Sequence, residues 1–246
     1  MKHRSDNEPG VFVERRSFLS VAAAALGAAA LGRAPTYASM PTADTRLDFA
    51  EFLRVVVPIA KELIGDKSRM GEDRYLHTLA SYAVRLADVP IPKMRQTTKG
   101  LGPHNFIGAN EAGDDCPFVV LHWRIEPGAK VGLHPHTYGN VVTLGLEGEA
   151  VVQNYEMVET ADFKRVEPFT VRRVQEQILR PGSVNLVPLT HGYVHGFVAG
   201  PTGARGLDIT TRLYERQPNT SLEISPKPVD AARGLYEGVW RFERDK

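Results

Sequence analysis

The feature of this sequence that most constrains its fold is a series of short apolar runs, rich in β-branched residues, between residues 118 and 213. Turns that contain glycine and proline, such as Pro127-Gly128 and Pro181-Gly182, separate these runs. Short strands at this spacing are typical of a β sandwich or barrel, so we predict an all-β core. The predicted strands cover residues 118–125, 141–146, 150–155, 169–179, 184–187, 194–198 and 206–213.

Two amphipathic helices are predicted ahead of these strands. Over residues 45–64 the apolar side chains recur at intervals of three and four, and Pro58 predicts a kink. A second periodic stretch, residues 72–86, has an apolar stripe that leaves His77 on the helix surface. We expect both helices to pack against the sheet, with a proline- and glycine-rich connection over residues 88–116.

The first forty residues have the organisation of an export signal. The run Arg15-Arg16-Ser17-Phe18-Leu19 precedes a short apolar stretch over residues 21–31, and Thr36-Tyr37-Ala38 places small residues at a cleavage position. The Arg-Arg-x-Phe-Leu order resembles the twin-arginine signal of bacteria, which implies export of the folded protein by that machinery to the periplasm or beyond. The alternative, a permanent membrane anchor, normally needs about 20 apolar residues, so no stable membrane span is expected.

Charge and cysteine content exclude several classes of function. The 30 lysines and arginines balance 29 acidic residues, and this net charge of +1 provides no basic surface for nucleic acid. Cys116 is the single cysteine of the chain. It excludes an intramolecular disulfide framework and any zinc or iron–sulfur site built from several cysteines.

The histidines are the best candidates for chemistry. His134-Pro135-His136 places two imidazoles two residues apart, and on a strand such residues point to the same face. A third histidine from a neighbouring strand would complete a set of three ligands on one side of an ion. Imidazole suits zinc, copper, iron and nickel, and three protein ligands leave open positions for reacting molecules.

The surroundings of this pair resemble the cupin superfamily. The spacing Gly128-x5-His134-x-His136-x4-Val141-x6-Gly148 is similar to the first cupin motif, and Gly182-x5-Pro188 followed by His195-x-Phe197 is similar to the second. The resemblance implies a double-stranded β-helix, the jelly-roll barrel of cupins, preceded here by the two helices. The expected organisation is a signal peptide over 1–38, a helical extension and connection over 39–116, the barrel over 117–215, and a tail over 216–246 packed on the barrel or on a partner.

The chain departs from the family pattern at two positions. Val141 occupies the place of the metal-binding glutamate, and strand alternation turns its neighbour Asn140 to the opposite face. The family spacing for the third ligand falls on Tyr193, which lies between His191 and His195. Because His195-x-Phe197 is similar to the second motif, we predict a site of His134, His136 and His195. His191 is the alternative third ligand.

Three-histidine sites among cupins occur in thiol dioxygenases such as the cysteine dioxygenase group, which this chain distantly resembles. The resemblance implies a non-haem Fe(II) dioxygenase acting on a small anionic or thiol substrate. Three neutral imidazoles leave the full charge of a divalent ion uncompensated, which favours an anionic substrate atom. The alternatives are a zinc- or manganese-dependent isomerase, lyase or hydrolase, or a non-catalytic cupin that binds a small ligand; zinc, manganese or nickel are the alternative metals.

Single residues provide candidates for substrate contacts, and the family resemblance provides an expectation for the assembly. Arg124 is a candidate anion anchor, and Tyr138, Asn140 and Tyr193 are candidates to line the mouth of the site. No catalytic side chain is assigned by spacing alone. Because cupins commonly pair through their sheets, the resemblance also implies a homodimer.

Overall fold

The computed structural model describes residues 46–97, 102, 104–159, 164–191, 193–215 and 220–242. These residues belong to one compact unit, residues 41–246. The export signal predicted over residues 1–38 lies outside the described residues, and so does the first residue of the predicted first helix.

Two helices precede the strands, as predicted. Helix α1 (Phe49–Leu63) begins after Asp48, whose side chain accepts a hydrogen bond from the backbone N–H of Glu51, and Pro58 lies inside it. Helix α2 (Arg69–Ala83) begins three residues before the predicted start, because Ser68 caps it by accepting from the N–H of Gly71. His77 is exposed on α2. None of the helices that the structure describes is long and apolar enough to cross a membrane.

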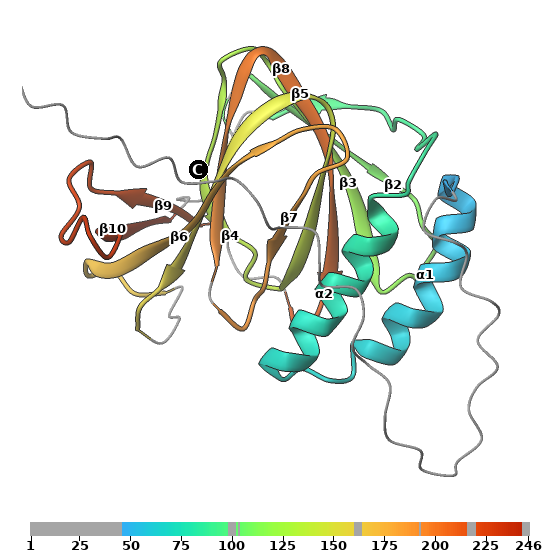
Figure 1. The fold of residues 1–246 in the computed structure, drawn as a ribbon, viewed down its shortest axis with the longest axis horizontal. Coiled ribbons are helices and arrows are strands. Elements are labelled where there is room, and N and C mark those ends of the chain that lie inside the picture. The colour runs from blue at the N-terminus through green and yellow to red at the C-terminus, as the bar shows by residue number, and fades with distance from the viewer. Residues whose placement is uncertain are drawn as a thin grey trace, which may run out of the picture. The chain divides into compact units, whose positions relative to one another are not determined.

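The strands form one curled, antiparallel sheet. Its order is β1-β2-β3-β8-β5-β6-β10-β9, with β4 paired to β8 and β7 paired to β5. This topology, with two helices ahead of it, confirms the predicted all-β jelly-roll barrel (Figure 1). The strands are β1 (Arg95–Gln96), β2 (Asn105–Asn110), β3 (Phe118–Ile125), β4 (Lys130–Pro135), β5 (Gly139–Met157), β6 (Phe169–Leu179), β7 (Val184–Val187), β8 (Val194–Arg212), β9 (Thr220–Ile224) and β10 (Leu235–Phe242).

Strands β5 and β8 are each longer than predicted, because each joins two predicted runs around a corner. They pair with each other along their lengths, and the register shifts near Gly148. Gly148 has a φ of +62°, and a Cβ atom there would lie 2.1 Å from the carbonyl oxygen of Gly203. Only glycine fits this close approach. The corner divides the barrel into two layers that share β5 and β8.

The first layer consists of β3, β7, the part of β5 before the corner and the part of β8 after it. Its outer face is apolar and packs on the helices in a core that includes Phe52, Leu76, Phe118, Val120, Val142, Leu144, Leu207 and Ile209. Its inner face carries Val141, Thr143, Asn185, Asp208 and Thr210 by strand alternation. The second layer consists of β4, β6 and the remaining parts of β5 and β8.

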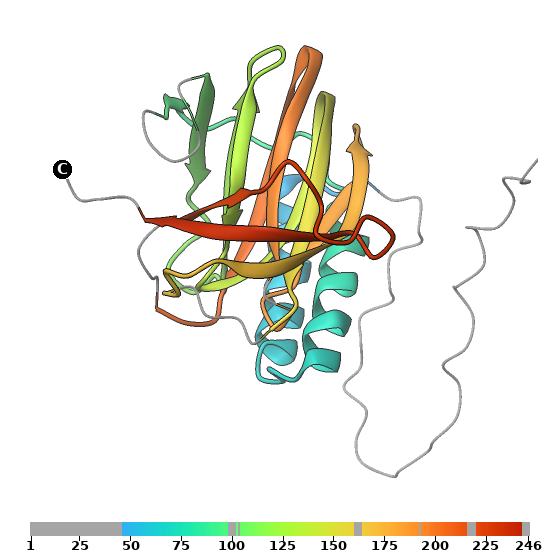
Figure 2. The same cartoon turned by 90° about the vertical axis from the view of Figure 1, so that its left-hand side faces the viewer.

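The C-terminal residues, predicted as a tail packed on the barrel or on a partner, form two strands that extend the sheet. β10 pairs with β6, and β9 pairs with β10. The two strands run across the barrel strands (Figure 2). Trp240 of β10 stacks near Phe169 of β6, with 5.2 Å between ring centroids. The predicted connection over residues 88–116 likewise contains β2, which pairs with β3. Both segments are short strands interrupted by polar residues or glycine, so their apolar alternation is weak.

Candidate metal centre

Three of the predicted histidines converge inside the barrel. His134 lies near the end of β4, His136 follows that strand, and His195 is the second residue of β8. One ring nitrogen from each histidine lies within 4.8 Å of the other two. The Nε2 atoms of His136 and His195 are 2.9 Å apart. Such a set of three imidazoles on one side can hold a divalent metal ion.

The strand geometry explains why these side chains meet. His134 lies directly opposite His195 in the β4–β8 pair, and Val131 lies opposite Phe197. Three residues on β4 therefore match two on β8, which is a β-bulge. The bulge brings His134 to the same face as His195. The i, i+2 relation then places His136 on that face as well.

A backbone hydrogen bond orients the first imidazole. The Nδ1 atom of His134 lies 2.9 Å from the carbonyl oxygen of Gly132, and since a carbonyl only accepts, Nδ1 carries the proton. The lone pair of Nε2 is then free for a metal ion. A partner of this kind on the far ring nitrogen is the usual support for a metal-binding histidine.

Burial favours the neutral form of His134 and His195. Removal from water lowers the pKa of His134. The pKa of His195 is well below its ordinary value, first because of burial and then because His134 and His136 lie beside it. Neutral imidazoles present lone pairs rather than N–H donors, as a metal ion requires. The donor set therefore fits a divalent cation.

No carboxylate joins the three histidines among the described residues. Val141 is fully buried on the inner face, at the position where the cupin motif would place a glutamate. Asn140 faces the other way, and its Nδ2 donates to Oε1 of Glu72 on α2 at 2.9 Å. Asn140 therefore supports the outside of the barrel, in contrast to its predicted place at the mouth of the site, because neighbouring strand residues alternate between faces.

His191, the alternative third ligand, is held by α2 instead. Its Nε2 atom lies 2.9 Å from Nε of Arg69 and 3.5 Å from Oδ1 of Asp73. Tyr193 packs its ring on that of His191, with 5.1 Å between centroids. The structure thus groups His191 and Tyr193 beside α2, whereas Tyr138 lies closer to the three converging histidines, with its ring centroid 6.4 Å from that of His136.

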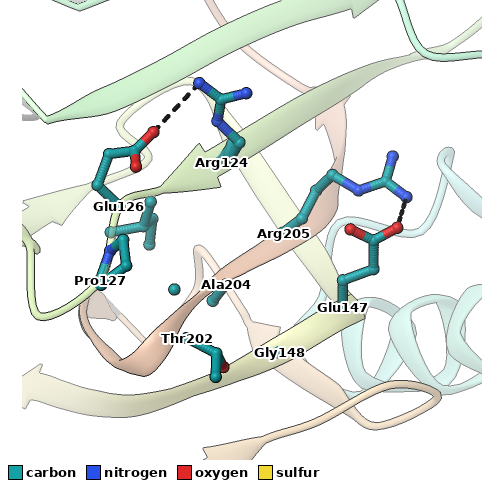
Figure 3. Close-up of a pocket in the computed structure, with 10 residues that line it drawn as sticks. Arg124, Glu126, Pro127, Glu147, Gly148, Thr202, Ala204 and Arg205 are labelled. Carbon is teal, nitrogen blue, oxygen red and sulfur yellow. Dashed lines mark hydrogen bonds and ion pairs between the residues drawn. The ribbon is translucent and has the colours of Figure 1, made fainter.

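Arg124 lies in a different pocket, of about 300 Å³, near the corner of the barrel. Figure 3 shows it paired with Glu126 on one side of this pocket, and Arg205 paired with Glu147 on the other. The described lining of this pocket includes none of the three histidines. Arg124 also stacks over Phe106 on β2 at 4.1 Å. It is therefore not placed to anchor a substrate beside the histidines, because its position near the end of β3 carries it toward the corner.

Two groups of residues near the site were not predicted. Glu72 of α2 is 3% exposed, and its carboxylate accepts hydrogen bonds from Asn140 and from the backbone N–H groups of Leu189 and Thr190. It thereby fixes the loop that leads to β8. The signal in the sequence was a charged residue among apolar ones on the face of α2.

The second group is the polar inner wall, which we define as Thr143, Asn185, Asp208 and Thr210. Oδ1 of Asp208 accepts from Oγ1 of Thr143 at 2.7 Å and from Nε1 of Trp123 at 3.2 Å. Burial raises the pKa of Asp208 to about 6, and these two hydrogen bonds act in the opposite direction. Polar residues at inward positions of otherwise apolar strands, such as Asn185 in Val-Asn-Leu-Val, were the available signal.

Comparison with protein-family models finds no match for the chain, and comparison with curated proteins finds none. Among solved structures, it is similar to KdgF from Halomonas sp., at 16% identity and a TM-score of 0.35, over 50% of this chain and 89% of that one. It is similar to a recombinant oxalate oxidase in complex with glycolate, at 14% identity and a TM-score of 0.36, over 49% and 56%. It is also similar to the Escherichia coli ribosomal oxygenase YcfD, at 22% identity and a TM-score of 0.30, over 38% and 23%. The matched part is half of this chain or less.

Proposed function

We propose that this protein is an exported cupin metalloenzyme, a non-haem Fe(II) dioxygenase that acts on a small anionic or thiol substrate. The observation that carries the proposal is the convergence of three imidazoles, with no carboxylate among them and with the buried Val141 at the position of the cupin glutamate. His134, His136 and His195 would hold the ion. When bound, iron would supply the electron transfer that the reaction of dioxygen with a substrate requires.

The chain's own residues have three tasks in this proposal. The carbonyl of Gly132 fixes the tautomer of His134, so that the lone pair of its Nε2 would be available to an ion. The barrel interior shields His195 from bulk water, because this residue is fully buried and packs on Phe197 with 4.8 Å between ring centroids. Three ligands without charge leave the site a net charge of +2, which favours an anionic group of the substrate.

For a thiol substrate the overall reaction balances as RSH + O₂ → RSO₂H. Sulfur loses four electrons, dioxygen gains four, and both oxygen atoms end on sulfur. No external reductant is needed. The absence of an external reductant distinguishes a dioxygenase from oxygenases that require a second electron donor. The reaction to be measured is therefore oxygen uptake with the substrate alone.

Metal analysis of the full chain, purified after expression with its own signal, tests the proposal. We expect close to one iron per chain, and its loss in the His134→Ala variant. His77→Ala is the matched control, because His77 is exposed on α2 and is not one of the three converging histidines. Oxygen uptake with 3-mercaptopropionate and with small carboxylic acids then tests the reaction. Stoichiometric zinc or manganese without oxygen uptake would contradict the dioxygenase, and equal iron in wild type and His134→Ala would contradict the site.

Substitutions in the predicted signal test the proposed export in a separate experiment. Replacement of Arg15 and Arg16 by lysine should retain the protein in the cytoplasm if the twin-arginine machinery carries it. Replacement of Arg4 by lysine is the control, because this residue precedes the motif. Unchanged export after the Arg15 and Arg16 replacements would contradict this part of the proposal.

A further inference from the structure

The polar inner wall forms two rows of side chains across three strands. In the first row, Thr143 of β5 lies directly opposite Asn185 of β7 on one side and Asp208 of β8 on the other. In the second row, Val141 lies opposite Val187 and Thr210. Directly opposite residues have Cβ atoms about 4.5–5.5 Å apart. The wall is therefore a continuous surface of hydroxyl, amide and carboxyl groups with an apolar border.

His195 and Asp208 lie at equal distances along β8 from the corner of the barrel. β8 turns the corner over residues 200–203; His195 lies five residues before it and Asp208 five residues after it. Side-chain contacts join the two layers: the ring of His195 packs on Phe197, and Phe197 packs on Trp123 at 5.4 Å. The indole of Trp123 in turn donates to Asp208. The contacts from His195 through Phe197 and Trp123 to Asp208 thus connect the proposed metal site with the wall.

Two members of the wall are buried without hydrogen-bond partners. Both side-chain atoms of Asn185, and Oγ1 of Thr210, have no partner among the residues that the structure describes. Asn185 is 1% exposed and Thr210 is fully buried. Buried polar groups are normally satisfied by protein, water or ligand, so unpaired groups beside a candidate reaction site indicate a ligand with matching groups.

The chemistry of the wall indicates what that ligand carries. An amide with a free donor and a free acceptor is complementary to hydroxyl groups, which both donate and accept. A thiol is a weak donor and a weak acceptor, so it would leave Asn185 and Thr210 unsatisfied. No lysine or arginine is among the buried residues of the described interior, so an anionic group is left to the cation.

We infer that Asn185, Thr210 and Asp208 bind the hydroxyl groups of a small hydroxylated carboxylate, whose carboxylate faces the ion held by the three histidines. The inference rests on the proposed function for the metal ion, and it narrows the substrate class from thiols to hydroxy acids. Asp208 contributes a carboxyl group with one oxygen, Oδ1, already occupied by Thr143 and Trp123. Its other oxygen is left for a substrate hydroxyl.

Calorimetric titration of the full chain tests the inference, with Fe(II) loaded under exclusion of oxygen. The probes are glycerate, propionate and 3-mercaptopropionate, which share a three-carbon carboxylate and differ in hydroxyl and thiol groups. We expect glycerate to bind about tenfold more tightly than the other two, as expected for the pairing of buried polar groups. Asn185→Leu should remove this preference and leave propionate binding unchanged. Thr210→Val should reduce it severalfold, and it serves as the second variant if Asn185→Leu does not fold.

Gln153→Leu is the matched control, since the same change removes an amide that hydrogen-bonds Glu176 on the exposed side of β5. It should leave all three affinities unchanged. Equal binding of glycerate and propionate by wild type, or tighter binding of 3-mercaptopropionate, would overturn the inference. The titrations are repeated without metal: a preference for glycerate that persists in the metal-free protein and disappears in Asn185→Leu supports the wall even if the protein takes up no iron. Loss of iron uptake contradicts only the proposed function.

Discussion

The two faces of the first layer of the barrel are built from the same strands but differ in the polarity of their side chains. The outer face of β3, β5 and β8 packs apolar side chains against α1 and α2. The inner face carries the polar inner wall, where Asn185 and Thr210 lack partners among the described residues. Burial on the outer face stabilises the fold, whereas burial on the inner face costs stability unless something binds there. The comparison indicates that the packing of α1 and α2 on the outer face offsets the cost of burying unpaired polar groups on the inner face.

The outer face should show the largest loss of stability on truncation. Phe52 of α1 is fully buried, with its ring 6.2 Å from that of Phe118. Phe52→Ala should lower the free energy of unfolding by about 3–5 kcal/mol, since it leaves a cavity between helix and sheet. Denaturation in urea measures the change. Met70→Ala on α2, where Met70 is 81% exposed, is the control and should change it by less than about 0.5 kcal/mol. A similar loss in both variants would remove the distinction.

His122 differs from the apolar residues of the outer face, because it is a fully buried imidazole. Neither ring nitrogen has a hydrogen-bond partner among the described residues. Burial, and then Arg205, lowers its pKa to about 4. Between pH 6.5 and 4 the unfolded chain binds more protons, so this residue makes the free energy of unfolding fall as the pH falls.

His122→Phe should remove about 2–3 kcal/mol of that acid destabilisation. Urea denaturation of both proteins between pH 4 and 7.5 measures it. Parallel pH profiles for wild type and variant would show that His122 is not held neutral by its surroundings.

Asp208 on the inner face should give the opposite sign. Its pKa of about 6 lies above the ordinary value of 3.8 because of burial, so between pH 4 and 6 the folded protein binds more protons. Its contribution then makes the free energy of unfolding fall by about 2–3 kcal/mol as the pH rises through this window. Asp208→Asn should abolish this fall, with Asp114→Asn, an exposed position, as the control. If Asp208→Asn lowers stability equally at pH 4 and pH 7, the carboxyl group is not titrating in this range.

Glu72 links α2 to the loop before β8, and its removal should have a moderate effect. Glu72→Gln places an N–H donor where the N–H groups of Leu189 and Thr190 point, at 2.9 and 2.8 Å. We expect a loss of about 1–3 kcal/mol in the free energy of unfolding, together with weaker metal binding because the loop positions His195. Glu62→Gln, at an exposed position of α1, is the control. Unchanged metal affinity would limit Glu72 to a role in stability.

The smallest effect is expected at the corner of the barrel. Arg124 pairs with Glu126 at 3.1 Å, and both side chains are largely exposed. Exposed ion pairs contribute little, so Arg124→Ala should change the free energy of unfolding by less than about 1 kcal/mol and leave metal content unchanged. Metal analysis and urea denaturation test both statements. A loss of bound metal in Arg124→Ala would contradict the conclusion that Arg124 lies apart from the histidines.

The local patterns of this sequence predicted most of the barrel. Strand alternation and turn residues located β3, β6 and β7, and the i, i+2 relation anticipated that His134 and His136 share a face. The patterns did not predict that β5 and β8 each continue around a corner. That depends on the close approach of Gly148 to the backbone of Gly203, a contact between segments far apart in the chain.

The surroundings of the site were harder to predict, because they depend on partners from distant elements. His191 and Asn140 are near the predicted ligands in sequence, but α2 holds both through Arg69 and Glu72. Arg124 lies on β3, which pairs with β8 of the inner wall, yet it lies at the corner end of that pair, opposite Arg205. Only the register between strands, which no local pattern encodes, brings Asn185, Thr143 and Asp208 together.

The sharing of β5 and β8 between both layers has a consequence for how the chain folds. Gly139 pairs with Arg212 and Tyr155 pairs with Val194, so both layers close only after long stretches of intervening chain have been brought together. Contacts so distant in sequence make folding slow. Because neither layer can form while β5 and β8 are unpaired, we expect them to fold in a single cooperative step, with no half-barrel intermediate. Amide hydrogens of β5 on either side of Gly148 should therefore exchange with solvent at similar rates.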